Sequence, residues 1–376
     1  MRILILIPSL GFGGAERLLI TLIPKLLNKN YIIEVCILNS PNDLGKELDK
    51  YNVKIHNLQL SHRWAIIEAI KKLKNIVDDF KPDILWGHLY FGILYSRIIK
   101  LFRRNTKVVS VLHYSISSDS QKKGLWYSFR NYIFNVSQKL DYRTIAVSKS
   151  IKKDYEDFFN WKNIDVIFNA LDLEHIDKSI NISDELINIY RKRYLNTNSS
   201  ILVTLPGRIH ESKGHKYLIE AKNILKSKFQ LNVKLLFIGS GPNKDNLLNL
   251  VKDDENIEFL DSLPQEELFK ILKSSDYIVI PSLFEAFGLA AIEAMYIEKP
   301  TVTTQIDGLV EITKDKYDTL QVKIKNPQDI ADAIKFYIDN QNEKSRISKN
   351  ARQTAKKYDV NNIVKQWEKI FNGESI

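Results

Sequence analysis

A run of small, apolar and acidic residues at 281–295 carries two glutamates with the spacing of a ligand site. It places Glu285 before the sequence Ala-Phe-Gly-Leu and Glu293 after it. A strand is predicted to end at the start of the run and a helix to begin near Gly288, so Glu293 falls in the second turn of that helix. Free N–H groups at such a helix start bind phosphate, and a carboxylate further along can bind a vicinal diol such as ribose. The alternative is a salt-bridged structural pair, because carboxylates among apolar residues need partners.

A pair of basic residues follows another predicted strand. The stretch 205–215 carries Arg208 and Lys213 in the pattern Gly-Arg-x4-Lys-Gly. A guanidinium makes forked hydrogen bonds to a diphosphate, and an ammonium acts on it as a point charge. Two such cations would stabilise a leaving nucleotide diphosphate as its negative charge grows. The alternative is a pair of solvated loop cations.

A glycine-rich turn follows the first predicted strand and opens a helix. It contains Gly11, Gly13 and Gly14, and it continues into Ala-Glu16-Arg17. Such a turn lets the backbone come close to a phosphate. A dinucleotide-binding fingerprint is disfavoured, because Glu16 occupies the place of its third small residue and the second strand has no ribose-binding acid at its tip. The alternative is a tight turn at positive φ, which accounts for Gly11 alone.

Composition excludes several classes of protein. The chain has 376 residues, 44% hydrophobic, with a single cysteine and seven histidines. One cysteine permits no intramolecular disulfide, no secretory signal is present, and no apolar run approaches the ~18 residues of a spanning helix, so we expect a cytoplasmic protein. No Asp-x-Asp pattern or closely spaced histidine cluster occurs, which predicts no metal site and no cofactor.

The positive charge is concentrated in one region. The chain has a net charge of +10, yet residues 61–153 alone carry 18 basic and 6 acidic residues, a net charge of +12. Aromatic side chains are interleaved with these charges: Trp64, Trp86, Trp126, Tyr127, Phe129, Tyr132 and Phe134. This pattern favours contact with an anionic membrane surface on the cytoplasmic face. The alternative is a solvated face with ordinary core aromatics, and no nucleic-acid-binding motif is present.

These residues must be positioned by two domains of parallel sheet, because short β-rich runs alternate with helical patterns along the whole chain. The strands predicted in the first half are Arg2–Ile7, Ile32–Leu38, Val53–Leu58, Ile84–Trp86, Lys107–Leu112 and Thr144–Val147. Those in the second half are Ile201–Leu205, Val233–Ile238, Ile257–Leu260, Tyr277–Ile280 and Thr301–Thr303. Ligands collect at the carboxyl ends of such strands, so two doubly wound, Rossmann-like α/β domains predict a site in a central cleft.

The three motifs, in this order, resemble those of the retaining nucleotide-sugar glycosyltransferases of the GT-B fold, family 4 (glycosyl transferases group 1). The resemblance extends from Ile3 to about Val310. It implies an N-terminal acceptor-binding domain at 1–170 and a C-terminal nucleotide-sugar-binding domain at 171–355. It also implies a C-terminal helix at 356–376 that crosses back to the first domain.

The resemblance also implies roles for individual residues. Arg208 and Lys213 would hold the donor diphosphate, Glu293 the nucleotide ribose, and Glu285 the donor sugar. Further donor contacts would come from Gly13, Gly14, Gly239 and the backbone of Phe287, Gly288 and Leu289. His113, after the fifth strand, would lie near the reacting sugar, which makes His113, Arg208, Lys213 and Glu285 the expected catalytic set. Outside this context a lone histidine is more often structural.

The implied reaction is transfer of a sugar from a UDP- or GDP-sugar to a hydroxyl. The basic, aromatic-rich region suggests that this hydroxyl belongs to a glycan or a polyprenyl-diphosphate-linked acceptor at the cytoplasmic membrane, in cell-surface polysaccharide, lipopolysaccharide or glycolipid assembly. Two alternatives remain open: a nucleotide-sugar epimerase of the same fold, and a non-catalytic membrane-associated binding protein. The chain departs from the family pattern at three places. The family usually has Asn-Gly where this chain has Asn169-Ala170, and a glycine where this chain has Asp261. It often has a pair of glycines where this chain has only Gly308.

Overall fold

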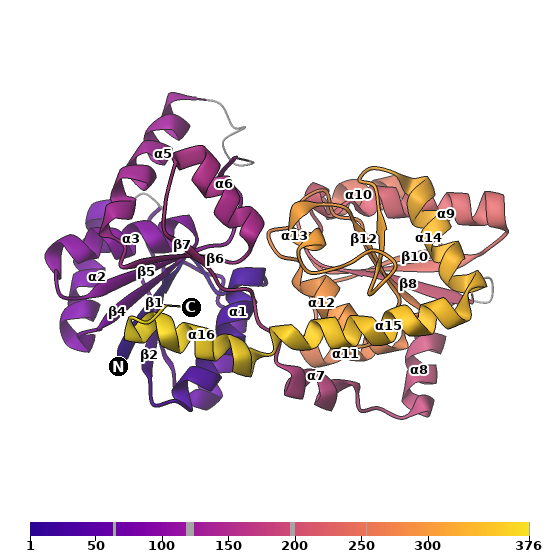
Figure 1. Ribbon diagram of the computed structural model, residues 1–376, viewed down its shortest axis with the longest axis horizontal. Coiled ribbons are helices and arrows are strands. Elements are labelled where there is room, and N and C mark those ends of the chain that lie inside the picture. The colour runs from indigo at the N-terminus through magenta and orange to yellow at the C-terminus, as the bar shows by residue number, and fades with distance from the viewer. Residues whose placement is uncertain (63–64, 118–123, 196–199, 253, 376) are drawn as a thin grey trace. The chain divides into compact units, whose positions relative to one another are not determined.

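The computed structural model of the chain describes residues 1–62, 65–117, 124–195, 200–252 and 254–375. The chain forms two compact units. The first contains Met1–Ala170 and Val360–Ile376, and the second contains Leu171–Asp359. Each unit is built on one sheet that is covered by helices (Figure 1).

The first unit has a seven-stranded parallel sheet in the order β3-β2-β1-β4-β5-β6-β7. Its strands are β1 (Arg2–Ile7), β2 (Ile32–Ile37), β3 (Lys54–Asn57), β4 (Ile84–His88), β5 (Lys107–Leu112), β6 (Arg143–Ala146) and β7 (Ile164–Val166). Its helices are α1 (Gly14–Leu27), α2 (Ile66–Phe80), α3 (Leu89–Phe102), α5 (Leu125–Ser137), α6 (Lys149–Phe159) and α16 (Val360–Asn372), with 3-10 turns at Leu44–Tyr51 and Gln138–Leu140. The central strands β1 and β4 are buried almost throughout, because helices cover both faces of a parallel sheet.

The last helix of the chain, α16, is part of the core of the first unit. The ring centroids of Trp367 and Phe371 lie 4.7 and 5.1 Å from that of Trp86 on β4. All three side chains are buried. Aromatic packing of this kind therefore holds the C-terminal segment against the middle of the sheet.

The second unit has a six-stranded parallel sheet in the order β10-β9-β8-β11-β12-β13. Its strands are β8 (Ile201–Pro206), β9 (Val233–Ile238), β10 (Ile257–Leu260), β11 (Tyr277–Ile280), β12 (Thr301–Thr304) and β13 (Leu320–Val322). Its helices are α7 (Leu173–Ile180), α8 (Asp184–Tyr194), α9 (His215–Phe229), α10 (Lys244–Leu250), α11 (Gln265–Ser274), α12 (Leu289–Tyr296), α13 (Asp307–Val310), α14 (Pro327–Asp339) and α15 (Gln341–Ala355), with 3-10 turns at Glu211–Lys213 and Lys356–Tyr358. One core cluster of this unit lies between β8, β9 and β11 and the helices α9 and α14, and a second packs β8 and β9 against α8 and α11.

The predicted architecture of two doubly wound, Rossmann-like sheets is confirmed. The sequence did not predict β7 and β13, which are edge strands of three residues with a polar residue at the centre. Strand β4 runs two residues past the predicted Trp86 and ends at His88. In the described part of the chain, no helix has the length and apolar character needed to cross a membrane.

Candidate active site

In each sheet the strand order reverses beside the first strand. The reversal lies between β1 and β4 in the first unit and between β8 and β11 in the second. The carboxyl ends of the strands at such a point frame a ligand crevice. The cationic pair predicted from sequence follows β8 and the glutamate pair follows β11, so both motifs belong to the reversal point of the second unit.

Lys213 and Glu285 are in direct contact. Lys213 Nζ donates to Glu285 Oε1 at 2.5 Å, and Ser282 Oγ donates to the same oxygen at 3.0 Å. The two charged side chains are only 25% and 12% exposed. The structure thus brings together one member of each predicted pair, and the ammonium group is held in a fixed place by a half-buried carboxylate.

The backbone around this contact is tightly joined. Leu283 N donates to Ser212 O at 2.7 Å. Gly214 has a φ of +70°, and a Cβ there would lie 2.0 Å from Pro281 O. Only glycine allows the start of α9 to approach the end of β11 this closely. The two loops therefore form one rigid base for Lys213 and Glu285.

The turn that carries Arg208 is supported by the neighbouring turn after β9. Ile209 N donates to Ser240 O at 3.0 Å. Gly239 has a φ of +148°, and a Cβ there would lie 2.2 Å from Gly207 O. The side chain of Arg208 is exposed at this edge. Gly239 thus contributes by letting two backbones pack, which fixes the turn that carries Arg208.

Helix α12 begins where the sequence predicts, with Gly288 as its N-cap at a φ of +97°. A Cβ at Gly288 would lie 2.5 Å from Leu309 Cδ2. Phe287 is buried against Tyr358, with ring centroids 5.4 Å apart, and Leu289 starts the helix. Glu293 is buried in the second turn. The free N–H groups of the first turn, which favour an anion, therefore lie on the same loop as Glu285.

The structure shows the surroundings of the three positions that depart from the family pattern. The exposed Asp261 accepts from Lys244 Nζ at 2.6 Å, an ion pair that lowers the pKa of Asp261. A Cβ at Gly308 would lie 2.1 Å from Glu285 O, so this single glycine already permits the close approach of α13. Ala170 is buried at the boundary of the first unit.

The alternative considered for the glycine-rich turn of the first unit, a tight turn at positive φ, does not apply to Gly11. Helix α1 begins at Gly14, and Gly13 is its N-cap with an extended φ of −144°. The described glycines at positive φ do not include Gly11. A Cβ at Gly11 would instead lie 2.9 Å from Pro41 Cγ, so close packing accounts for this glycine.

His113 has a partner that sequence analysis missed. His113 follows β5 and is half-buried, whereas His88 ends β4 and is fully buried. Nδ1 of His88 and Nε2 of His113 are 2.9 Å apart. Burial lowers the pKa of His113 to about 3, and burial together with His113 holds the pKa of His88 well below its ordinary value. The sequence does place His88 at the end of the apolar run of β4, the strand that pairs with β5, and this position could have predicted the contact with His113.

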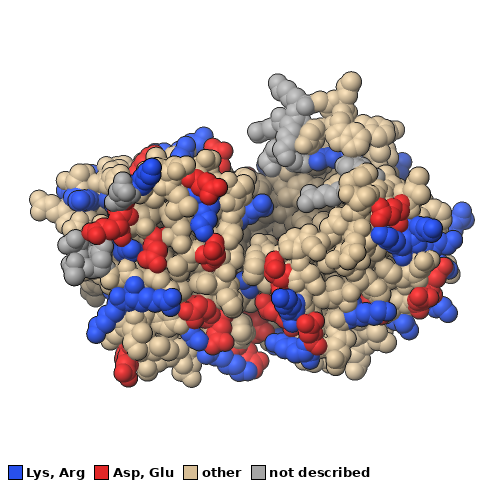
Figure 2. Space-filling view, turned by 180° about the vertical axis from the view of Figure 1, so that it is seen from behind, with Lys and Arg blue, Asp and Glu red and all other residues tan. Residues whose placement is uncertain are grey.

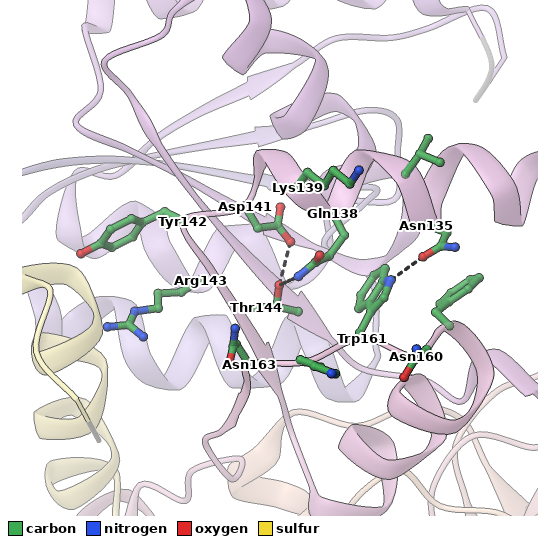
Figure 3. A pocket seen from close by; sticks show the side chains of 13 residues that line it. Asn135, Gln138, Lys139, Asp141, Tyr142, Arg143, Thr144, Asn160, Trp161 and Asn163 are labelled. Atoms are coloured by element: carbon green, nitrogen blue, oxygen red, sulfur yellow. Dashed lines mark hydrogen bonds between the residues drawn. The ribbon is translucent and has the colours of Figure 1, made fainter.

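A polar hollow of about 720 Å³ lies elsewhere in the first unit (Figure 3). It is lined by residues that precede β7 and by residues that precede or begin β6, so it opens at the amino ends of these strands, away from the carboxyl end that carries His113. Asp141 in its wall accepts from Thr144 Oγ1, and Trp161 Nε1 donates to Asn135 Oδ1, as Figure 3 shows. Basic residues on its rim are Lys139, Arg143 and Lys162. The hollow is therefore separate from the candidate site.

No cluster of three or more histidine, cysteine, aspartate or glutamate side chains suited to a metal ion occurs within the residues that the structure describes. The positively charged features of the candidate site are Arg208, Lys213 and the N-terminus of α12.

Comparison with known proteins identifies the class. A family model described as Glycosyl transferases group 1 matches residues 187–354, and one described as Glycosyltransferase Family 4 matches residues 12–175. An uncharacterized glycosyltransferase of Methanocaldococcus jannaschii is 32% identical over 356 residues, which cover 90% of this chain and 89% of that protein. The chain is therefore a glycosyltransferase, and it belongs to glycosyltransferase family 4.

Two further similarities are more distant. The N,N'-diacetylbacillosaminyl-diphospho-undecaprenol alpha-1,3-N-acetylgalactosaminyltransferase of Campylobacter jejuni is 24% identical, over 80% of this chain and 79% of that protein. The crystal structure of Anabaena HepE in complex with UDP has a TM-score of 0.82 and 18% identity, and the match covers 99% of this chain and 100% of that one. The fold is accordingly that of the GT-B glycosyltransferases.

Proposed function

We propose that the chain transfers one sugar from a nucleotide diphosphate sugar, UDP- or GDP-linked, to a hydroxyl of a glycan or lipid-linked acceptor, with retention at the anomeric carbon. The observation that carries this proposal is the contact between Lys213 and Glu285 beside the N-terminus of α12. A diphosphate there would meet a cation from the loop after β8 and backbone N–H groups from the loop after β11. The UDP complex of HepE supports UDP as the first donor to test.

Each residue would have a distinct part in donor binding. Arg208 and Lys213 would neutralise the diphosphate, and Glu293 would accept hydrogen bonds from the ribose hydroxyls. Glu285, which fixes Lys213, would also accept from a hydroxyl of the donor sugar. His113, in the first unit, would contact the reacting sugar. Two cations and a helix terminus supply the charge that a divalent ion provides elsewhere, so we propose that transfer needs no metal.

The chemical step breaks the bond between the anomeric carbon and the diphosphate oxygen, and it forms a bond from the same face to the acceptor oxygen. The proton of the acceptor hydroxyl passes to the departing diphosphate oxygen, so no external base is required. Positive charge develops on the sugar ring and negative charge on the leaving group, and Arg208 and Lys213 stabilise the latter.

The proposed acceptor is a glycan carried on a polyprenyl diphosphate, as in cell-surface polysaccharide or glycolipid assembly. The name of the Campylobacter relative, which specifies a diphospho-undecaprenol substrate, supports this class. So does the concentration of positive charge in residues 61–153, since basic residues near anionic headgroups contribute about 1 kcal/mol each.

Helix α5 is the element of this region that fits a membrane. Its outward face carries Leu125, Trp126, Phe129, Tyr132 and Val136, all exposed, and Leu125 is 93% exposed. Their spacing places them along one side of a helix. In Figure 2 the surface next to the grey residues at the top, where α5 lies, shows mostly uncharged side chains. Trp64 and residues 118–123 of the same region lie outside the described residues.

Donor screening followed by product analysis tests the proposed function. We expect a UDP- or GDP-sugar to raise the melting temperature of the protein, because a ligand that binds only the native state stabilises it. With a polyprenyl-diphosphate-linked acceptor, and with EDTA present, we expect a new α- or β-linkage that keeps the anomeric configuration of the donor. Formation of an isomeric nucleotide sugar without acceptor would indicate an epimerase, and donor binding without turnover on any acceptor would indicate a binding protein.

A further inference from the structure

His88 and His113 are neighbours because of the sheet topology. Strands β4 and β5 pair in parallel, with His88 opposite Val111. The carboxyl ends of the two strands therefore bring the two imidazoles together, with ring centroids 5.2 Å apart and Nδ1 of His88 2.9 Å from Nε2 of His113. This contact occupies one nitrogen of His113 and leaves Nδ1 for a substrate oxygen.

Aromatic side chains pack against the ring of His88 and fix its position. Its ring centroid lies 4.9 Å from that of Trp86, two residues earlier on the same face of β4. Trp86 is covered by Trp367 and Phe371 of α16. The backbone of His88 is also fixed, because His88 is the N-cap residue of α3. A fully buried ring between a strand and packed aromatic side chains has little freedom to turn.

The protonation of the pair follows from its surroundings. Both pKa values are lowered, so both rings are neutral near pH 7 and a single proton lies between the two nitrogens. Nε2 of His88 is buried and has no hydrogen-bond partner among the described residues. If His113 were the donor, His88 would carry its proton on Nε2 as a buried N–H without an acceptor, which is rarer in proteins than an unfilled acceptor. His88 is therefore the donor.

We infer that His88 is a positioning residue that donates its Nδ1–H to Nε2 of His113 and so holds His113 as the Nδ1–H tautomer. In this state His113 presents a donor, and it makes a hydrogen bond to an oxygen of the reacting sugar. The inference rests on the proposed function in that it takes His113 to face the reacting sugar. His88 itself acts only through His113 and does not contact the substrate.

The test combines kinetics with a spectroscopic measurement on wild-type, His88→Leu, His88→Asn and His113→Ala proteins. Leucine removes the donor, whereas the side-chain amide of asparagine restores one near the position of Nδ1. We expect H88L to lower kcat about 10- to 100-fold with the donor KM changed less than about twofold, because the hydrogen-bond donor is misplaced rather than the nucleotide. We expect H88N to recover most of kcat, and H88L to cause no further loss in the H113A background.

Nitrogen-15 NMR of histidine-labelled protein reports the tautomer without any need for activity. We expect His113 to be the Nδ1–H form in wild-type and H88N proteins and a mixture in H88L. The inference would be overturned if His113 were the Nε2–H form in wild type. It would also be overturned if the losses of kcat caused by H88L and by H113A multiplied in the double variant. If no transfer occurs at all, the proposed function fails and the NMR result alone decides the tautomer. If H88L does not fold, the nitrogen-15 spectra of wild type and H88N show which tautomer His113 adopts.

Discussion

Nζ of Lys213 lies 2.5 Å from Oε1 of Glu285, which joins the loop after β8 to the loop after β11. The pair sits at the point where the strand order of the second sheet reverses. A cation fixed in this way needs little reorganisation when negative charge appears on a leaving group, and such preorganisation is the usual origin of large electrostatic effects in catalysis.

Replacing Lys213 with alanine should therefore lower kcat/KM about 10²- to 10³-fold, the usual cost of losing one preorganised group that stabilises developing charge. Lys216, exposed one residue into α9, provides a matched control. K216A should keep wild-type kinetics. Steady-state rates of both variants check this, and equal rates for K213A and K216A would contradict the assigned role of Lys213.

Replacing Gly239 with alanine should destabilise the protein more than replacing Gly124. Both glycines have a φ of +148°, but a Cβ at Gly239 would meet Gly207 O at 2.2 Å, and at Gly124 no atom lies within 4 Å. The two variants share the cost of a left-handed backbone, so their difference isolates the clash. We expect G239A to lose about 1–3 kcal/mol more than G124A in chemical denaturation, the usual cost of forcing an extra methyl group into packed space. Equal losses would show that conformation alone requires Gly239.

The exposed face of α5 should bind anionic lipid. Changing both Trp126 and Phe129 to serine removes two half-exposed aromatic side chains, and binding to vesicles that contain phosphatidylglycerol should fall at least about tenfold. The matched control changes Ile189 and Leu250, exposed apolar residues of the second unit, to serine. Vesicle sedimentation measures both. Undiminished binding of the α5 variant, or an equal loss in the control, would remove α5 as the membrane contact.

The histidine pair should make stability depend on pH. Since the folded pKa values of His88 and His113 lie below the ordinary value of 6.5, the unfolded chain binds more protons between pH 6.5 and about 3. Stability is thus fully present above pH 6.5 and falls as the pH drops through this window. His88→Asn removes one of the two groups. Its melting temperature should fall less steeply than that of wild type between pH 7 and 4.5, and parallel curves would refute the assignment.

The fold and the motif positions followed from sequence because their signals are local. Apolar runs marked most strands, and the inner strands Val233–Ile238 and Tyr277–Ile280 and the edge strand Ile257–Leu260 match the predicted ranges. The start of α12 was predicted near Gly288 for the same reason. Glycine-containing turns directly after buried strands therefore located the candidate site without any knowledge of the tertiary structure.

The remaining features depend on contacts between distant segments. The spacing of Lys213 and Glu285 along the chain gives no indication of a 2.5 Å contact, which arises because β8 and β11 are neighbours in the sheet. The same holds for His88, whose partner follows the next strand. The packing of Gly11 against Pro41 was likewise not predictable, because Pro41 lies outside the turn of Gly11.

A crystal structure with bound UDP or GDP would show where the donor diphosphate binds. We expect the diphosphate within hydrogen-bond distance of Lys213 Nζ and of the backbone N–H groups at the start of α12, with the ribose against Glu293. A diphosphate bound instead in the hollow rimmed by Lys139, Arg143 and Lys162, or at any place that does not contact Lys213, would contradict this expectation.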